Sequence, residues 1–145
     1  MLLRPGDVTW IDVVVPHEHA RWTDDISTSA YWLGEVWCRA LASLGASDLT
    51  VHRGAMVRTP WSGHVCFAGI GGGEVMQGAA KAVGVSQRRT RAAARFQCAV
   101  YHRWDAALHA ALFRAPGPSV VDLTGITAEI DATPGDVRDA FVQAI

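Results

Sequence analysis

The chain has 145 residues, of which half are apolar and 19% are charged, and its formal net charge is −1 at pH 7. This length fits one domain with its own core, and the near-neutral charge argues against a broad nucleic-acid or anionic-membrane surface. The sequence has neither the long apolar start of a signal peptide nor the ~20 apolar residues that span a bilayer. Its three cysteines show no Cys-x-x-Cys spacing, which indicates free thiols. We therefore expect one cytoplasmic domain, residues 1–145, that binds no nucleic acid and no membrane.

The first part of the chain has the pattern of a strand, a helix and a second strand. Residues 7–15 are mostly β-branched and apolar and end at Pro16, which predicts a largely buried strand. After a polar loop, apolar residues at helical spacing predict a helix over residues 26–44, closed by Gly45. A short strand is expected over residues 49–52.

The rest of the chain alternates predicted strands and helices after a long glycine-rich segment over residues 54–73. A segment of this length without structure of its own is usually functional or mobile. The further expected elements are strands over 74–77, 81–87 and 95–101 and helices over 106–113 and 134–145. Asp105 and Thr133 are the expected N-caps of these helices. This order predicts a mixed α/β (α+β) fold.

Lysine is almost absent from the chain, which has twelve arginines but only Lys81. A bias in codon usage produces such a composition without any functional meaning. The alternative is a site that needs a compact, flexible ammonium group, which a planar guanidinium does not replace.

A motif surrounds this lysine. Residues 78–89 read Gly-Ala-Ala-Lys-Ala-Val-Gly-Val-Ser-Gln-Arg-Arg. They resemble the segment Gly-x-Lys-apolar-apolar-Gly-x-small-Gln-Arg-Arg of the lipoate–protein ligases and octanoyltransferases, the biotin/lipoate protein ligase-like family. In that family the lysine holds the acyl carbonyl and, in the ligases, the acyl-adenylate, so the resemblance assigns a catalytic role to Lys81. It also implies that four neighbours bind the substrate: Gly78, Gly84, Ser86 and Gln87.

A Cys-Phe pair lies fifteen residues before the lysine, at Cys66 and Phe67. This arrangement is similar to that of octanoyltransferases with a cysteine nucleophile in the same loop, and it implies that Cys66 is the nucleophile. A cysteine attacks as its thiolate, which a nearby cation such as Lys81 stabilises. The alternative is that Cys66 is a small buried apolar residue, as we expect for Cys38 and Cys98.

The resemblance implies that an octanoyl or lipoyl group passes from a donor to Cys66 and then to a lysine of a lipoyl (acyl-carrier) domain, with no cofactor. The Asn-Asp pair that adenylating ligases carry near this loop is absent, which favours transfer. ATP-dependent lipoate ligation through lipoyl-AMP, with ATP and Mg²⁺, is the first alternative. A non-catalytic remnant of the same fold is the second.

Three arginines follow the motif, at Arg88, Arg89 and Arg91. They form either a solvated strand edge or a patch that contacts an acidic acyl-carrier domain or a phosphate. His17 and His19 have the spacing of a ligand pair, but no third ligand is suitably spaced, so we expect no metal site.

The chain also departs from the family pattern. In the family, an Arg-Arg-x-Gly-Gly-Gly-Ala-Val segment with preceding strands lies just upstream of a sequence like residues 2–9, whereas this chain begins with Met1. Three explanations account for the missing segment: the chain is a fragment, its gene start is misplaced, or the protein is degenerate. We expect an open groove or exposed apolar surface beside the strand over residues 7–15, and either a homodimer through this edge or poor solubility. The alternative is a compact monomer whose other strands close the gap.

Overall fold

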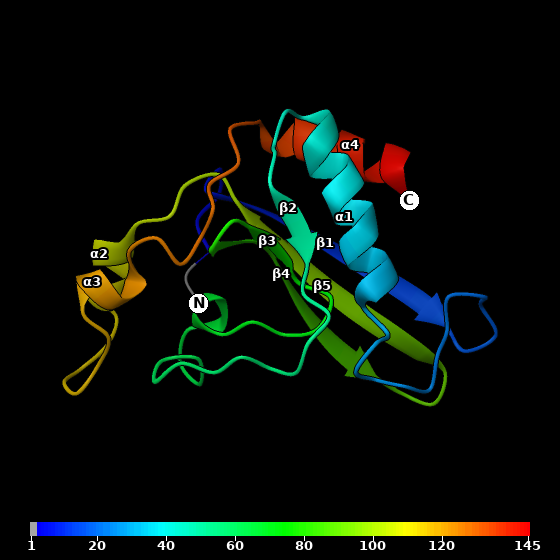
Figure 1. Ribbon diagram of the computed structural model, residues 1–145, viewed down its shortest axis with the longest axis horizontal. Coiled ribbons are helices and arrows are strands. Elements are labelled where there is room, and N and C mark those ends of the chain that lie inside the picture. Colours follow the sequence, from blue (N-terminus) through cyan, green and yellow to red (C-terminus); the bar gives the residue numbers. More distant parts are fainter. Residues whose placement is uncertain (1–2) are drawn as a thin grey trace.

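A five-stranded antiparallel sheet forms the centre of the computed structural model, which describes residues 3–145. The order across the sheet is β1-β5-β4-β3-β2 (Figure 1). The strands are β1 (Val8–Pro16), β2 (Leu49–Val51), β3 (Val75–Gln77), β4 (Ala80–Arg89) and β5 (Ala93–Tyr101). The mixed α+β fold predicted from the sequence is confirmed.

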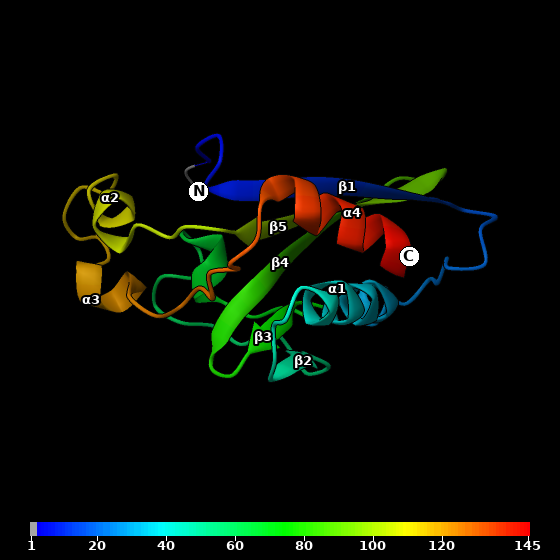
Figure 2. The same cartoon turned by 90° about the horizontal axis from the view of Figure 1, so that it is seen from above.

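Two helices cover one face of the sheet, α1 (Tyr31–Ser43) and α4 (Pro134–Ala144) (Figures 1 and 2). Two short helices, α2 (Ala106–Ala110) and α3 (Val120–Leu123), lie together at one end of the molecule. No helix described over residues 3–145 is both long and apolar enough to cross a membrane.

The apolar interior is divided into two clusters. The larger cluster joins α1 and α4 to the sheet, and Trp37 and Phe141 meet at its centre with ring centroids 4.4 Å apart. The smaller cluster holds Phe67, Tyr101 and Trp104, next to α2 and α3. The sheet is therefore packed on both faces, but by different parts of the chain.

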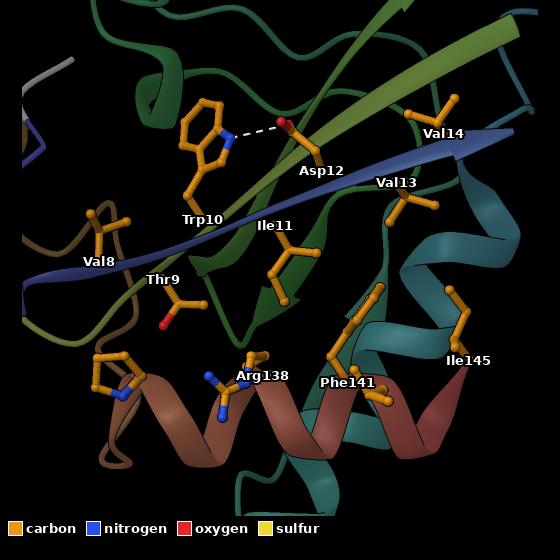
Figure 3. A pocket seen from close by; sticks show the side chains of 12 residues that line it. Val8, Thr9, Trp10, Ile11, Asp12, Val13, Val14, Arg138, Phe141 and Ile145 are labelled. Carbon is orange, nitrogen blue, oxygen red and sulfur yellow. Dashed lines mark hydrogen bonds between the residues drawn. The ribbon is translucent and has the colours of Figure 1, made fainter.

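Strand β1 is an edge strand that pairs with β5 and with no other strand of the described residues. A groove of about 730 Å³ runs between β1 and α4 (Figure 3). Val14 is 59% exposed and Trp10 is 39% exposed. The open groove and exposed apolar surface expected beside this strand are confirmed, since residues 17–145 leave one of its edges and part of a face uncovered.

Three helices differ from the sequence prediction. Helix α2 ends at Ala110 rather than at residue 113. Helix α1 begins at Tyr31 rather than at residue 26, because the hydroxyls of Ser27 and Thr28 donate to the Asp25 carboxylate and stabilise a turn in place of a helix. Helix α3 was not predicted at all. Its sequence signal is the capping box of Ser119, whose hydroxyl accepts from the backbone N–H three residues later.

Candidate functional site

Cys66 begins the 3-10 turn η1 (Cys66–Ala68) at the end of the long glycine-rich segment. Its side chain is exposed, whereas the next residue, Phe67, is 3% exposed. The Phe67 ring meets the Tyr101 ring edge-on, with centroids 5.0 Å apart. A Cβ atom at Gly84 would lie 2.8 Å from this ring, so a glycine is required there. Phe67 therefore anchors the turn against β4 and fixes the position of Cys66.

Lys81 lies on β4 beneath the turn and is 1% exposed. Its Nζ donates to the carbonyl oxygen of Cys66 at 2.9 Å and forms an ion pair with Glu74 Oε2 at 2.7 Å. It also lies 5.1 Å from the ring centroid of Phe67. Burial lowers the pKa of Lys81 from its usual value, and the Glu74 carboxylate opposes that shift. Cys66 and Lys81 therefore lie close together, but the contact is to the Cys66 carbonyl oxygen, and the buried Lys81 does not line the pocket beside the thiol as a groove-facing ammonium would.

Glu74 is a residue of this cluster that the sequence argument missed. Its Oε2 accepts from the backbone N–H of Gly71 at 2.7 Å, and its Oε1 accepts from that of Val85 at 3.1 Å. With the ion pair to Lys81, these bonds tie the glycine-rich segment to β4. A buried carboxylate requires such partners. The only signal in the sequence was an acidic residue between three glycines and an apolar strand.

A pocket of about 110 Å³ opens beside Cys66 on the face of the sheet opposite α1 and α4. Trp10, Ala99 and Gly84 come from β1, β5 and β4, where they are cross-strand neighbours. Ser86, Gln97 and Glu74 add polar groups to the lining. The pocket is thus a mainly apolar slot with a thiol at its wall.

The predicted substrate-binding residues are distributed over two places. Gly84 and Ser86 line the pocket together with Cys66. Gly78 lies in the β3–β4 turn, where its backbone N–H donates to the Asp48 carbonyl, and it does not line the pocket. The side-chain amide of Gln87 hydrogen-bonds to the Ser29 hydroxyl at 2.8 Å and likewise does not line it.

The three arginines of the predicted patch also separate. Arg88 is exposed and is paired in register with Arg95 of β5, and Arg91 is exposed in the turn after β4. Arg89 donates to the carbonyl oxygen of Thr23 and lies over the Trp22 ring. Arg88 and Arg91 are therefore accessible to a partner, whereas Arg89 is engaged within the chain.

The two other cysteines differ from each other. Cys98 is fully buried, and burial raises its pKa to about 12. Cys38 was expected to be buried and is only half-buried on α1, because it lies at the border of the core stripe of the helix. Burial and the Glu35 carboxylate raise its pKa. No three His, Cys, Asp or Glu side chains within residues 3–145 come together as a metal-ion site.

No family profile matches this sequence, and no curated protein matches it. Among solved structures, it is similar to a proposed lipoate protein ligase from T. acidophilum, with a TM-score of 0.66 and 17% identity, over 95% of this chain and 50% of that one. The same protein with bound lipoic acid gives a TM-score of 0.63 and 16% identity, over 93% of this chain and 48% of that one. Lipoate-protein ligase A bound with ATP is similar with a TM-score of 0.64 and 18% identity, over 93% of this chain and 49% of that one. The chain therefore has the fold of the lipoate protein ligases and spans about half of their length.

Proposed function

We propose that this chain carries out acyl transfer: an octanoyl or lipoyl group passes to Cys66 and then to a lysine of a lipoyl (acyl-carrier) domain. The observation that carries the proposal is an exposed thiol on the wall of a mainly apolar pocket, on a residue whose carbonyl oxygen accepts from a buried lysine. The Cys66 thiolate attacks the thioester carbonyl of the donor, and the donor thiolate leaves. The neutral amine of the acceptor then attacks the Cys66 thioester, loses a proton, and the Cys66 thiolate leaves.

Lys81 has the role of holding the acyl carbonyl in this proposal. An ammonium has three N–H donors, and Glu74 and the Cys66 carbonyl oxygen use two of them. The remaining donor, or an exchange with the Cys66 carbonyl, supports the oxyanion that forms at the acyl carbon. Glu74 and the Phe67 ring hold the ammonium in place, so Lys81→Arg is expected to lose most of the transfer activity, because the wider head group does not fit there.

ATP-dependent lipoate ligation is the competing function, with ATP and Mg²⁺ as cofactors and lipoyl-AMP as the intermediate. It is favoured by the likeness to lipoate-protein ligase A, which was solved with ATP. A non-catalytic remnant is the third reading, and it is favoured by the chain's span of about half of the solved structures.

The partners that follow are an octanoyl or lipoyl donor and an acidic acyl-carrier domain, which we propose to contact the exposed Arg88 and Arg91. We also propose that the free edge of β1 pairs with the same edge of a second copy, as open strand edges tend to do. A cytoplasmic location completes the proposal, because free thiols such as those of Cys38 and Cys66 persist in a reducing compartment.

The test is intact-mass spectrometry of the chain after incubation with an octanoyl-carrier protein, without ATP. Acyl transfer predicts an octanoyl adduct on Cys66 that is lost in Cys66→Ser and kept in the matched control Cys38→Ser. Modification of the acceptor only from free lipoate or octanoate with ATP and Mg²⁺, unaffected by Cys66→Ser, would establish ligation instead. No modification under either condition would favour the remnant.

A further inference from the structure

A second, smaller cavity lies next to Cys66. Its volume is about 20 Å³, and its lining includes Cys66, Phe67, His64, Trp104 and His109. A space of this size holds about one water molecule. Cys66 therefore lines both the pocket of about 110 Å³ and this water-sized cavity.

His109, on α2, contributes an unpaired nitrogen to this region. The residue is 5% exposed, and its Nδ1 lies 2.9 Å from the carbonyl oxygen of Asp105. A carbonyl only accepts, so Nδ1 carries the proton and Nε2 carries the lone pair. Nε2 is buried and has no hydrogen-bond partner among the described groups. Stacking on Trp104, with centroids 3.8 Å apart, fixes the plane of the ring.

The other titratable groups around this thiol are poor proton acceptors. Lys81 is ion-paired with Glu74, and the Glu74 carboxylate, which lines the larger pocket, also accepts two backbone N–H bonds. The pKa of Tyr101 is raised to about 12, mainly by burial and further by negative charge on Cys66, so its phenol stays protonated. The Asp105 carboxylate accepts from the backbone N–H of Leu108 as a helix cap. His64 lines the same cavity but is exposed.

We propose that His109 is the general base that activates Cys66, through one water molecule in the small cavity. The thiol gives its proton to the water as the water gives a proton to Nε2 of His109, which leaves a thiolate and an imidazolium. No oxidant or further reactant is needed, and the reverse path returns the proton. This inference rests on the proposed nucleophilic role of Cys66.

The experiment is alkylation of the full chain by iodoacetamide from about pH 5 to about pH 10, with the rate at each cysteine followed by peptide mass spectrometry. His109→Gln removes the base, and His109→Phe keeps a ring for stacking on Trp104. At pH 7 we expect Cys66 to react on the order of tenfold more slowly in both variants, because the thiolate is the species that reacts and the base that forms it is gone. Above about pH 9 the rates converge, because the thiol then ionises unaided.

The matched control is His64→Gln, since His64 lines the same cavity, and the rate at Cys38 in each sample reports an intact fold. Equal rates at Cys66 in the wild type and both His109 variants at pH 7 would overturn the inference. A rate difference that persists unchanged above pH 9 would also overturn it, because it would indicate a structural role. A larger loss of the Cys66 alkylation rate in His64→Gln than in His109→Gln would show that His64, and not His109, is the base.

Alkylation uses no acyl donor, so the two proposals fail independently. Dependence of Cys66 alkylation on His109 without octanoyl transfer would support the base and refute the transferase. Octanoyl transfer together with Cys66 alkylation that does not depend on His109 would support the transferase and refute the base.

Discussion

The two faces of the sheet serve different purposes, although the same strands build both. On the face under α1 and α4, side chains such as Leu33 and Trp37 are fully buried in a continuous core. On the opposite face, the Cys66 turn with α2 and α3 covers one end, where Phe67 packs over Gly84. Strand alternation makes this division possible, because neighbouring residues point to opposite faces. One face can thus supply stability while the other keeps a pocket open.

A matched pair of tryptophan substitutions tests this division, and one of its members should have the largest effect. Trp37→Ala removes a fully buried ring that contacts Phe141 and should lower the free energy of unfolding by ~3–5 kcal/mol. Trp10→Ala, on the open face, should cost only about 1 kcal/mol. Denaturant unfolding measures both. Equal losses would mean that the open face supports the fold as strongly as the covered one.

The buried ion pair gives the next largest effect. Lys81→Met leaves the Glu74 carboxylate buried without its cation and should destabilise by about 3 kcal/mol, the lower end for such pairs, because two backbone N–H donors remain. Glu74→Gln in the Lys81→Met background removes the unpaired charge and should recover part of that loss. A double-mutant cycle of unfolding free energies measures this coupling. Additive losses would show that the two side chains do not act as a pair.

The open edge of β1 should show its effect in the oligomeric state. A pairing of two β1 strands centred on Ile11 sets Val8 against Val14 and Trp10 against Asp12 of the second copy, and it avoids opposing the two aspartates. Val14→Lys should block this pairing and give a monomer, since lysine on an edge strand disfavours association.

Sedimentation velocity over a range of protein concentrations measures the state. Val121→Lys, on the 84%-exposed residue of α3, is the matched control and should leave the dimer intact. A wild-type chain that stays monomeric would contradict the pairing.

The smallest expected effect concerns the arginines of the open face. Arg88→Glu should raise the KM for an acidic carrier domain by roughly two- to fivefold at low salt, with less effect at high salt. Arg114→Glu introduces the same charge change at another exposed position and serves as control. The KM for the carrier domain is measured in steady-state transfer assays at two ionic strengths. Identical KM values for Arg88→Glu and Arg114→Glu would show that Arg88 is not part of the docking surface.

The candidate site was predicted from the sequence only where a motif was contiguous. The pattern around Lys81 and the Cys-Phe pair at Cys66 led to two residues that the structure brings into contact, through the Lys81 ammonium and the Cys66 carbonyl oxygen. Glu74 and His109 were missed, because neither belongs to a recognisable motif. Their roles depend on which N–H groups, rings and cavities the fold brings beside them.

Local signals alone determined most of the elements. A β-branched run predicted β1, alternation of side chains predicted β5, and Thr133 as N-cap with Pro134 in the first turn predicted α4. These signals are local because backbone hydrogen bonds, caps and side-chain periodicity involve residues close in sequence. Only the tertiary structure decided which face of β1 is covered, that β1 lies at the edge of the sheet, and that a histidine from α2 lies near Cys66. Alternation shows which residues share a face, but the element that covers this face comes from a distant part of the chain.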